Sequence, residues 1–352
     1  MREFQRGGRT VLHPKVPPSG DDARRTKRRR WWLWGAALIL LFLVVDYAAY
    51  PRLAPIGGRS ANRGANGIWL RYTWYFGRWD DARLTRLAKR LRAGQIRYAY
   101  CHVRDINEDG RLRFRYPQQA RRLVEALHRQ IPSLKVIAWI YAANETAGGP
   151  VNIADLDVRQ RMTAEALWLV KECGFDGIQW DYEICPNGDR SLLALLRETR
   201  AALPEGTFLS VCTPMWYPWP AGPRCGWDER YFADVAARCD QLAVMCYDSG
   251  LWMPRWYVWL VRQQAWRVTR AAAVGNSRCR VMLGVPTYGP AGPSHHAYSE
   301  NLRMALKGVR EGVADRRAAL ASFDGVAMFA DYTTSAREWR EYVSLWVAGE
   351  GR

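Results

Sequence analysis

The sequence predicts an α/β protein, a closed (β/α)8 TIM barrel with one N-terminal transmembrane helix. From residue 67 onward, short apolar runs suited to buried strands alternate eight times with longer amphipathic segments. The alternation occupies about 285 residues, which is enough chain for one barrel of this kind. A separate apolar stretch near the N-terminus accounts for the additional helix.

Residues 1–30 are strongly basic. They hold ten lysines and arginines against three acidic residues, so much of the formal net charge of +18 lies at one end of the chain. A basic arm of this kind often binds nucleic acid, but such arms are not normally followed by a membrane span. We therefore expect a cytoplasmic tail and no nucleic-acid partner.

The transmembrane prediction rests on residues 31–50, WWLWGAALILLFLVVDYAAY, in which Asp46 is the one charged residue. As a helix this stretch is about 30 Å long, which matches the hydrocarbon core of a bilayer. Aromatic side chains stand at both of its ends, as in interfacial belts. The positive-inside bias keeps the basic tail in the cytoplasm and places the rest of the chain on the extracytoplasmic (periplasmic or extracellular) side.

An uncleaved signal anchor is favoured over a removed signal peptide. Asp46 or Tyr47 occupies the position where a cleavage site needs a small residue. Residues 51–66 are rich in Pro, Gly and Ser without periodicity and are interpreted as a linker. The barrel domain is then 67–352.

The predicted elements alternate strictly along the barrel domain. The expected strands are 67–71, 95–101, 134–141, 175–181, 207–212, 241–247, 280–285 and 323–329. The expected helices are 80–93, 117–131, 157–173, 189–203, 227–238, 255–274, 299–313 and 335–347. A doubly wound open sheet is the alternative, weakened by the count of eight and by the lack of a G-x-G-x-x-G turn after any strand.

The fourth expected strand carries the main candidate site, in the stretch GFDGIQWDYEIC (174–185). Its apolar part runs directly into Asp181 and Glu183, two carboxylates that burial penalises unless they have a use. Side chains alternate along a strand, so Gln179, Asp181 and Glu183 share one direction, and function in a barrel lies at the carboxyl ends of strands. The charge of Asp181 raises the pKa of Glu183 and suits it to be a general acid. A structural ion-pair or metal layer is the alternative.

Four motifs resemble glycoside hydrolase family 18, the chitinases and their relatives. DGIQWDYE (176–183) resembles the family's D-G-x-D-x-D-x-E signature, and MCYD (245–248) resembles its Met-x-Tyr-Asp. LGVPTYG (283–289) and GVAMF (325–329) are similar to its seventh and eighth strands. Two residues depart from the pattern: Gln179 replaces the middle Asp, and Phe329 replaces a Trp that floors the sugar subsite.

The resemblance implies substrate-assisted retaining hydrolysis of glycans that contain N-acetylhexosamine. Glu183 is then the general acid/base, Asp181 holds the acetamido N–H, and Tyr247 holds the acetamido oxygen. The ends of the fifth and seventh strands offer no carboxylate that would serve as a separate nucleophile, in agreement with this mechanism. We expect Gln179 to donate its amide N–H to Asp181 and favour the ionised carboxylate. The expected substrate-binding residues are Gln179, Asp248, Met245, Trp216, Tyr288 and Phe329.

Two tryptophan-rich stretches receive different interpretations. PMWYPWP (214–220) follows the fifth strand, so its rings are expected to stack on sugar faces at the mouth of the barrel. Trp252, Trp256 and Trp259 recur on one face of a helix, and we expect them to pack against the barrel, with contact to a membrane surface as the lesser alternative.

The eight cysteines and the pair His295–His296 lack the spacings of a zinc site, so neither a metal nor a cofactor is predicted. In an oxidising compartment, Cys239–Cys279 and Cys185–Cys225 are plausible disulfides by their places next to adjacent elements. The sequence thus predicts a membrane-anchored glycoside hydrolase with a polysaccharide or oligosaccharide substrate. The alternatives are a catalytically silent, lectin-like relative and a hydrolase of a glycan without acetamido groups.

Overall fold

The computed structural model describes residues 20–57 and 61–349, without the side chains of residues 20–27 and Pro223. The chain divides into two compact units, Met1–Arg52 and Leu53–Arg352. Much of the basic tail predicted for residues 1–30 lies outside the described residues.

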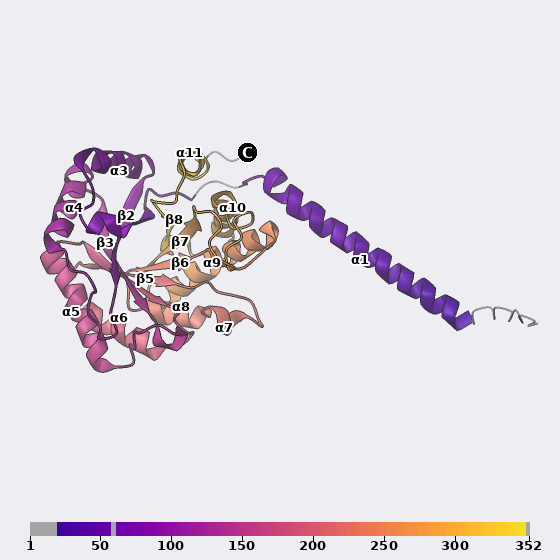
Figure 1. Cartoon of the computed structure of the whole chain (residues 1–352), viewed down its shortest axis with the longest axis horizontal. Helices are drawn as coiled ribbons and strands as arrows, with labels where there is room; N and C mark the ends of the chain where they lie inside the picture. The colour runs from indigo at the N-terminus through magenta and orange to yellow at the C-terminus, as the bar shows by residue number, and fades with distance from the viewer. Residues whose placement is uncertain (1–19, 58–60, 350–352) are drawn as a thin grey trace, which may run out of the picture. The chain divides into compact units, whose positions relative to one another are not determined.

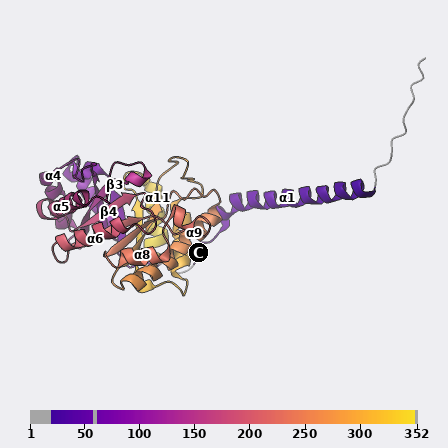
Figure 2. The same cartoon turned by 90° about the horizontal axis from the view of Figure 1, so that it is seen from below.

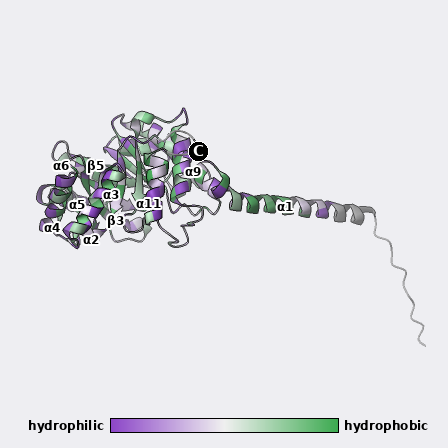
Figure 3. Cartoon of the chain, turned by 90° about the horizontal axis from the view of Figure 1, so that it is seen from above, coloured by the Kyte–Doolittle hydropathy of each residue, from purple (hydrophilic) through white to green (hydrophobic). Residues whose placement is uncertain are grey.

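The described residues of the first unit belong to helix α1 (Gly20–Leu53), whose last residue is the first of the second unit. Its part from Arg28 to Leu53 is long and apolar enough to cross a membrane, and Figure 3 colours much of it as hydrophobic. The side chains of its most apolar window are not buried by protein. The same properties are found in signal sequences. The helix is longer than the predicted span and includes Pro51, so the connection to the barrel begins at Ala54.

The second unit is a closed barrel of eight parallel strands in sequential order (Figure 1). The strands are β1 (Asn66–Leu70), β2 (Ile96–Asp105), β3 (Lys135–Ala143), β4 (Gly177–Glu183), β5 (Phe208–Thr213), β6 (Gln241–Met245), β7 (Arg280–Pro286) and β8 (Phe323–Phe329). Pairing of Ile68 with Met328 closes β1 onto β8, which confirms the barrel and excludes the open doubly wound sheet.

Helices lie outside the strands and connect them (Figure 2). The main ones are α3 (Asp81–Ala93), α4 (Pro117–Gln130), α5 (Leu156–Cys173), α6 (Arg190–Ala202), α8 (Glu229–Ala236), α9 (Pro254–Gly275), α10 (Leu302–Val313) and α11 (Ala336–Tyr342). Short helices were not predicted: α2 (Tyr72–Tyr75), α7 (Gly222–Cys225), η1 (Glu145–Ala147) and η2 (Leu320–Ser322). The last predicted helix divides into α11 and a π-helical turn, Val343–Val347.

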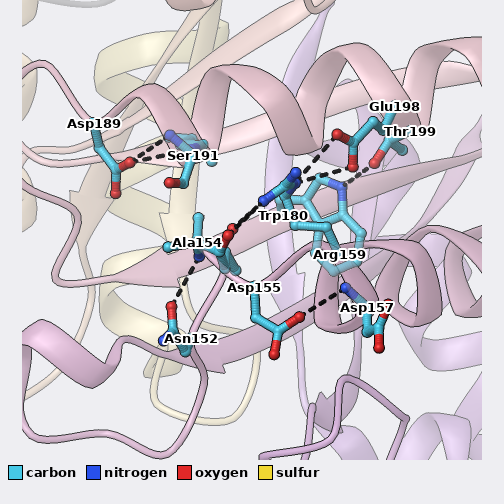
Figure 4. A network of polar contacts seen from close by, with 12 residues as sticks. Asn152, Ala154, Asp155, Asp157, Arg159, Trp180, Asp189, Ser191, Glu198 and Thr199 are labelled. Carbon is cyan, nitrogen blue, oxygen red and sulfur yellow. Dashed lines mark hydrogen bonds and ion pairs between the residues drawn. The ribbon is translucent and has the colours of Figure 1, made fainter.

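Helices α5 and α6 lie on the outer side of β4, the strand that carries the candidate site (Figure 4). Trp180 points out of the barrel and donates its indole N–H to Thr199 of α6 at 3.1 Å. Arg159 of α5 binds Glu198 of α6 at 3.1 Å and also donates to the carbonyl oxygen of Ile153 at 2.8 Å. Because neighbouring residues of a strand face opposite ways, an outward Trp180 directs Asp181 inward.

Trp252 lies before α9, which begins at Pro254, so the three tryptophans do not form one helix face, and contrary to the expectation their side chains are not packed against the barrel. Trp252, Trp256 and Trp259 are 66%, 52% and 43% exposed. The reason is the close approach of α9 to α10: a Cβ atom added at Gly308 would lie 2.7 Å from Val261, and one at Gly312 would lie 2.5 Å from Ala265. Aliphatic and small side chains fit this narrow interface, and indole rings do not.

All eight cysteines are unpaired in the structure, so neither suggested disulfide is formed. The sulfur atoms of Cys239 and Cys279 lie 4.0 Å apart, close together but not bonded. Cys185 is buried and its sulfur lies 3.9 Å from the hydroxyl of Tyr231, whereas Cys225 is exposed.

Candidate active site

Asp181 lies at the centre of the candidate site and is 4% exposed. Its Oδ2 atom accepts a hydrogen bond from the indole N–H of Trp139, on the neighbouring strand β3, at 2.7 Å. Its Oδ1 atom is buried and has no hydrogen-bond partner among the described residues. A buried acceptor without a donor is costly, so this atom is available to an N–H group of a ligand.

The charge of Asp181 affects the protonation of Glu183 on the same strand. Burial raises the pKa of Asp181 to about 6, although the N–H of Trp139 and the thiol of Cys212 favour its charged form. The charge of Asp181, then burial, and then the charge of Asp248 raise the pKa of Glu183 well above its usual range. At neutral pH Glu183 therefore keeps its proton while Asp181 is mainly ionised, which is the division of roles that a general acid needs.

Gln179 is not a hydrogen-bond donor to Asp181, contrary to the expectation from the sequence. Its Oε1 atom accepts from the indole of Trp69 on β1 at 2.8 Å, and its Nε2 atom donates to Ser210 on β5 at 3.0 Å. Gln179 is fully buried in the interior of the barrel, one layer below Asp181. In this position the amide links three strands, and the donor to Asp181 is Trp139.

Gln179→Leu is therefore expected to affect stability more than pH dependence. The substitution removes the acceptor of the buried indole N–H of Trp69, at a cost of about 1–3 kcal/mol. It also removes the donor to the hydroxyl of Ser210, which keeps its hydrogen bond to Gln241 at 3.1 Å. Thermal unfolding should show a melting temperature several degrees lower. Gln160→Leu, the same chemical change at an exposed position of α5, is the matched control. A variant as stable as the parent would contradict this role for Gln179.

Aromatic rings form the apolar surface next to the carboxylates. Tyr247 and Phe329 stack with their ring centroids 4.9 Å apart, and Trp69 meets both rings edge-on. Met245 and Phe329 pack against the buried cluster that contains Trp69 and Trp139. Burial raises the pKa of Tyr247 well above its usual range, so its hydroxyl stays protonated and able to donate. The peptide bonds that follow Glu183 and Phe329 are cis.

Asp248 follows β6 with a positive φ of 55°. The hydroxyl of Tyr288 donates to its Oδ1 atom at 2.8 Å, so these two predicted residues lie together. The ring of Tyr288 stacks on His295 at 4.1 Å, and His295 lies between Asp248 and Glu300. The two carboxylates raise the pKa of His295 to about 9, although burial, the largest effect, acts in the opposite direction.

Trp216 has one ring face covered by protein. Its backbone N–H and C=O both bind the side chain of Gln264 of α9, and the guanidinium of Arg267 lies 3.9 Å from the ring centroid. Trp219 of the same loop is 89% exposed. The structure thus leaves Trp219, rather than Trp216, with both ring faces available for stacking.

Sequence reasoning did not single out four residues around the site: Trp139, His102, His295 as a site residue, and Glu300. His102 stacks on Trp139 at 4.0 Å, and burial lowers the pKa of His102 to about 3, which keeps it neutral. Trp139 lies on an expected strand with its side chain inward, so its phase on β3 was the available signal. His295 and Glu300 lie in a loop, where no periodicity shows which way a side chain points.

Comparisons with known proteins agree with this geometry. The family model for glycosyl hydrolases family 18 matches residues 71–345. No curated protein matches the chain. The structure is similar to the Bacillus cereus spore cortex-lytic enzyme SleL (TM-score 0.55, 13% identity, 82% of this chain and 75% of that chain). It is also similar to a chitinase from Bacteroides thetaiotaomicron (TM-score 0.51, 14% identity, 81% of this chain and 97% of that chain). The chain therefore belongs to glycosyl hydrolase family 18 and is a glycoside hydrolase.

Proposed function

We propose that the enzyme hydrolyses glycans that contain N-acetylhexosamine, by a substrate-assisted retaining mechanism. The observation that carries this proposal is the unpartnered Oδ1 atom of Asp181 on the same strand as Glu183. A 2-acetamido group presents an N–H donor, which is what the Oδ1 atom lacks. A sugar with a hydroxyl at this position also has a donor, but it has no carbonyl oxygen with which to attack.

In the first step, Glu183 transfers its proton to the glycosidic oxygen. The carbonyl oxygen of the acetamido group attacks the anomeric carbon, and the bond to the leaving oxygen breaks. Asp181 accepts the acetamido N–H and balances the positive charge of the oxazolinium ion that forms. The hydroxyl of Tyr247 donates to the acetamido oxygen and holds it in line. These interactions stabilise charge that develops during the reaction, in a site already organised to receive it.

In the second step, Glu183 is a carboxylate and removes a proton from water. The oxygen of the water attacks the anomeric carbon, the bond to the acetamido oxygen breaks, and the neutral acetamido group is restored. Two displacements at the same carbon give retention of configuration, and Glu183 returns to its protonated form.

The remaining residues orient the sugar in this proposal. Asp248 and Tyr288 form a hydrogen-bonded pair beside the reacting residues, and Phe329 with Met245 supplies an apolar surface for one sugar face. Gln179 supports the barrel from below through Trp69 and Ser210 and does not contact the sugar.

Paired substrates test the proposal. Chito-oligosaccharides, peptidoglycan fragments and acetylated exopolysaccharide fragments should be compared with the same glycans after removal of the N-acetyl groups. We expect cleavage of at least one acetylated glycan, with the β or α configuration of the substrate retained in the first product seen by NMR. Equal cleavage of the de-N-acetylated partner would refute the acetamido mechanism, and binding without cleavage of any glycan would favour the lectin-like alternative.

We also propose that α1 anchors the enzyme and that the barrel lies on the extracytoplasmic side. The apolar segment Arg28–Leu53 and the basic residues before it support this topology. Protease added to intact spheroplasts should digest the barrel and leave residues 1–30 in a protected fragment. A cytoplasmic protein of the same cells is the control for lysis. A protected barrel would contradict the topology, and a mature N-terminus beyond residue 50 would identify a cleaved signal.

A further inference from the structure

We propose that Asp248, His295 and Glu300 form a binding site for one divalent metal ion of the zinc class. Each residue offers one ligand atom, and the three atoms lie within 4.8 Å of one another. They come from the segment after β6 and from the long connection between β7 and α10, so the folded barrel brings them together from distant parts of the sequence. The proposed hydrolytic steps assign no role to an ion at this place.

The distances between the ligand atoms fit a shared ion. The Nδ1 atom of His295 lies 3.4 Å from Oδ1 of Asp248 and 3.6 Å from Oε2 of Glu300. Both distances are longer than an ordinary N–H···O hydrogen bond, which spans about 2.7–3.2 Å. Around a tetrahedral zinc ion with bonds of about 2.0–2.2 Å, neighbouring ligand atoms lie about 3.3–3.6 Å apart.

His295 supplies the independent evidence that a ligand is missing. Its side chain is 0% exposed, and neither ring nitrogen has a hydrogen-bond partner among the described residues. Buried polar side chains normally have hydrogen-bond partners, whereas the contacts of His295 with the two carboxylates are ion-pair distances of 3.4 and 3.6 Å without a hydrogen bond, and this needs an explanation. A metal ion bound to Nδ1 provides one.

The negative charges of Glu300 and Asp248 also favour a divalent metal ion as the ligand. The side chain of Glu300 is 0% exposed, and Asp248 lies next to it, so two negative charges share one small region. Buried charges require compensation. A proton on His295 offsets one of the two charges, whereas a divalent ion offsets both and leaves the imidazole neutral as the third ligand.

The surroundings hold the ligands in place and leave a route for the ion. The backbone N–H and the hydroxyl of Ser249 donate to the two oxygens of Glu300 at 3.0 and 2.9 Å, and Tyr288 donates to Asp248. Such outer contacts orient the ligands of metal sites. The side chain of Asp248 is 46% exposed, which leaves a way in and an open fourth position. One nitrogen and two carboxylate ligands suit Zn²⁺ and disfavour Ca²⁺, which takes oxygen ligands.

The test is titration of the full-length chain with Zn²⁺ in detergent, without a histidine tag and after chelator treatment. Cys225, an exposed thiol, is replaced by serine in all proteins so that it does not compete for the ion. Calorimetry should show one Zn²⁺ per chain, and Ca²⁺ should bind far more weakly. His295→Ala and Glu300→Gln should each lower the affinity by at least about 100-fold, since loss of an outer contact alone costs about 10–100-fold.

His296→Ala is the matched control, because its ring stacks on Trp252 at 3.8 Å and it does not belong to the ligand group. It should bind Zn²⁺ as the parent does. If the folded parent binds no Zn²⁺, or if His295→Ala binds as well as the parent, the three residues are an internal histidine–carboxylate ion pair and the proposal is overturned.

If both ligand variants unfold, the absorption spectrum of Co²⁺ bound to the parent chain is the deciding measurement. Bands of a four-coordinate ion without a thiolate charge-transfer band support the site, and their absence overturns it. No glycan takes part, so the outcome is independent of the proposed hydrolytic activity.

Discussion

Glu183→Gln is expected to lower kcat by about 10²–10⁴-fold on the best acetylated substrate, the usual contribution of a general acid. Glutamine has nearly the same shape as a protonated glutamic acid, but its amide cannot transfer a proton to the leaving oxygen. The raised pKa of Glu183 means that the parent side chain already occupies its site as a neutral group. The variant should therefore fold and bind as the parent does, and lose only the proton transfer.

Steady-state kinetics and oligosaccharide binding, measured on the same preparations, separate these effects. Glu108→Gln makes the same chemical change at an exposed position after β2 and is the control for handling and folding. Equal turnover by Glu183→Gln and the parent would remove Glu183 from the mechanism. Loss of binding together with loss of turnover would instead indicate that the substitution disturbs the site as a whole.

The strands of the barrel were predictable because each buries an apolar run between turn residues. β4 is the clearest case: Gly177–Glu183 lies within two residues of the predicted strand at each end, and its inward and outward faces alternate as expected. Helix starts were also predictable, because side chains such as Asp80, Asp155 and Asn301 cap them. The π-helical turn after Tyr342 carries no comparable signal.

Contacts across the barrel were not predictable in the same way. The strand pattern correctly turns Gln179 inward, but its partners are fixed by which residues of β1 and β5 reach the same layer, and that depends on register around the closed sheet. The face of α9 that is buried depends in turn on two glycines of α10, which lie about 50 residues further along the chain. Periodicity predicted a tryptophan face but did not determine whether that face meets protein or solvent.

The candidate site also contains residues that were predictable and residues that were not. Asp181, Glu183, Tyr247 and Phe329 stand at or just after strand ends, where the alternation of side chains and the barrel rule place them together. His295 and Glu300 belong to the loop before α10, and their contact with Asp248 depends on the path of that loop. The sequence therefore predicted that these candidate residues lie together, and missed the buried histidine beside them.

Asp181→Asn is expected to lower turnover by about 10²–10³-fold, in line with loss of one preorganised charge-stabilising group, and also to shift the pH profile. In the parent, Asp181 must be ionised and Glu183 protonated, so activity should fall below a pH of about 6, the pKa of Asp181, and again as the pH rises through the raised pKa of Glu183. Asparagine is similar in size and still presents an oxygen to the indole of Trp139, but it carries no charge.

The direction of the shift follows from what raises the pKa of Glu183. The largest contribution is the charge of Asp181, ahead of burial and Asp248, so removing that charge lowers the pKa of Glu183. Glu183 then loses its proton at lower pH, and the alkaline limb of kcat/KM against pH should move to lower pH. The acidic limb set by Asp181 should disappear at the same time.

Asp109→Asn, the same chemical change at the surface beside Arg111, is the control. Because the two carboxylates titrate as a coupled pair, the measured limbs belong to the pair. An alkaline limb that stays in place in a folded Asp181→Asn variant would show that Asp181 does not control the proton on Glu183.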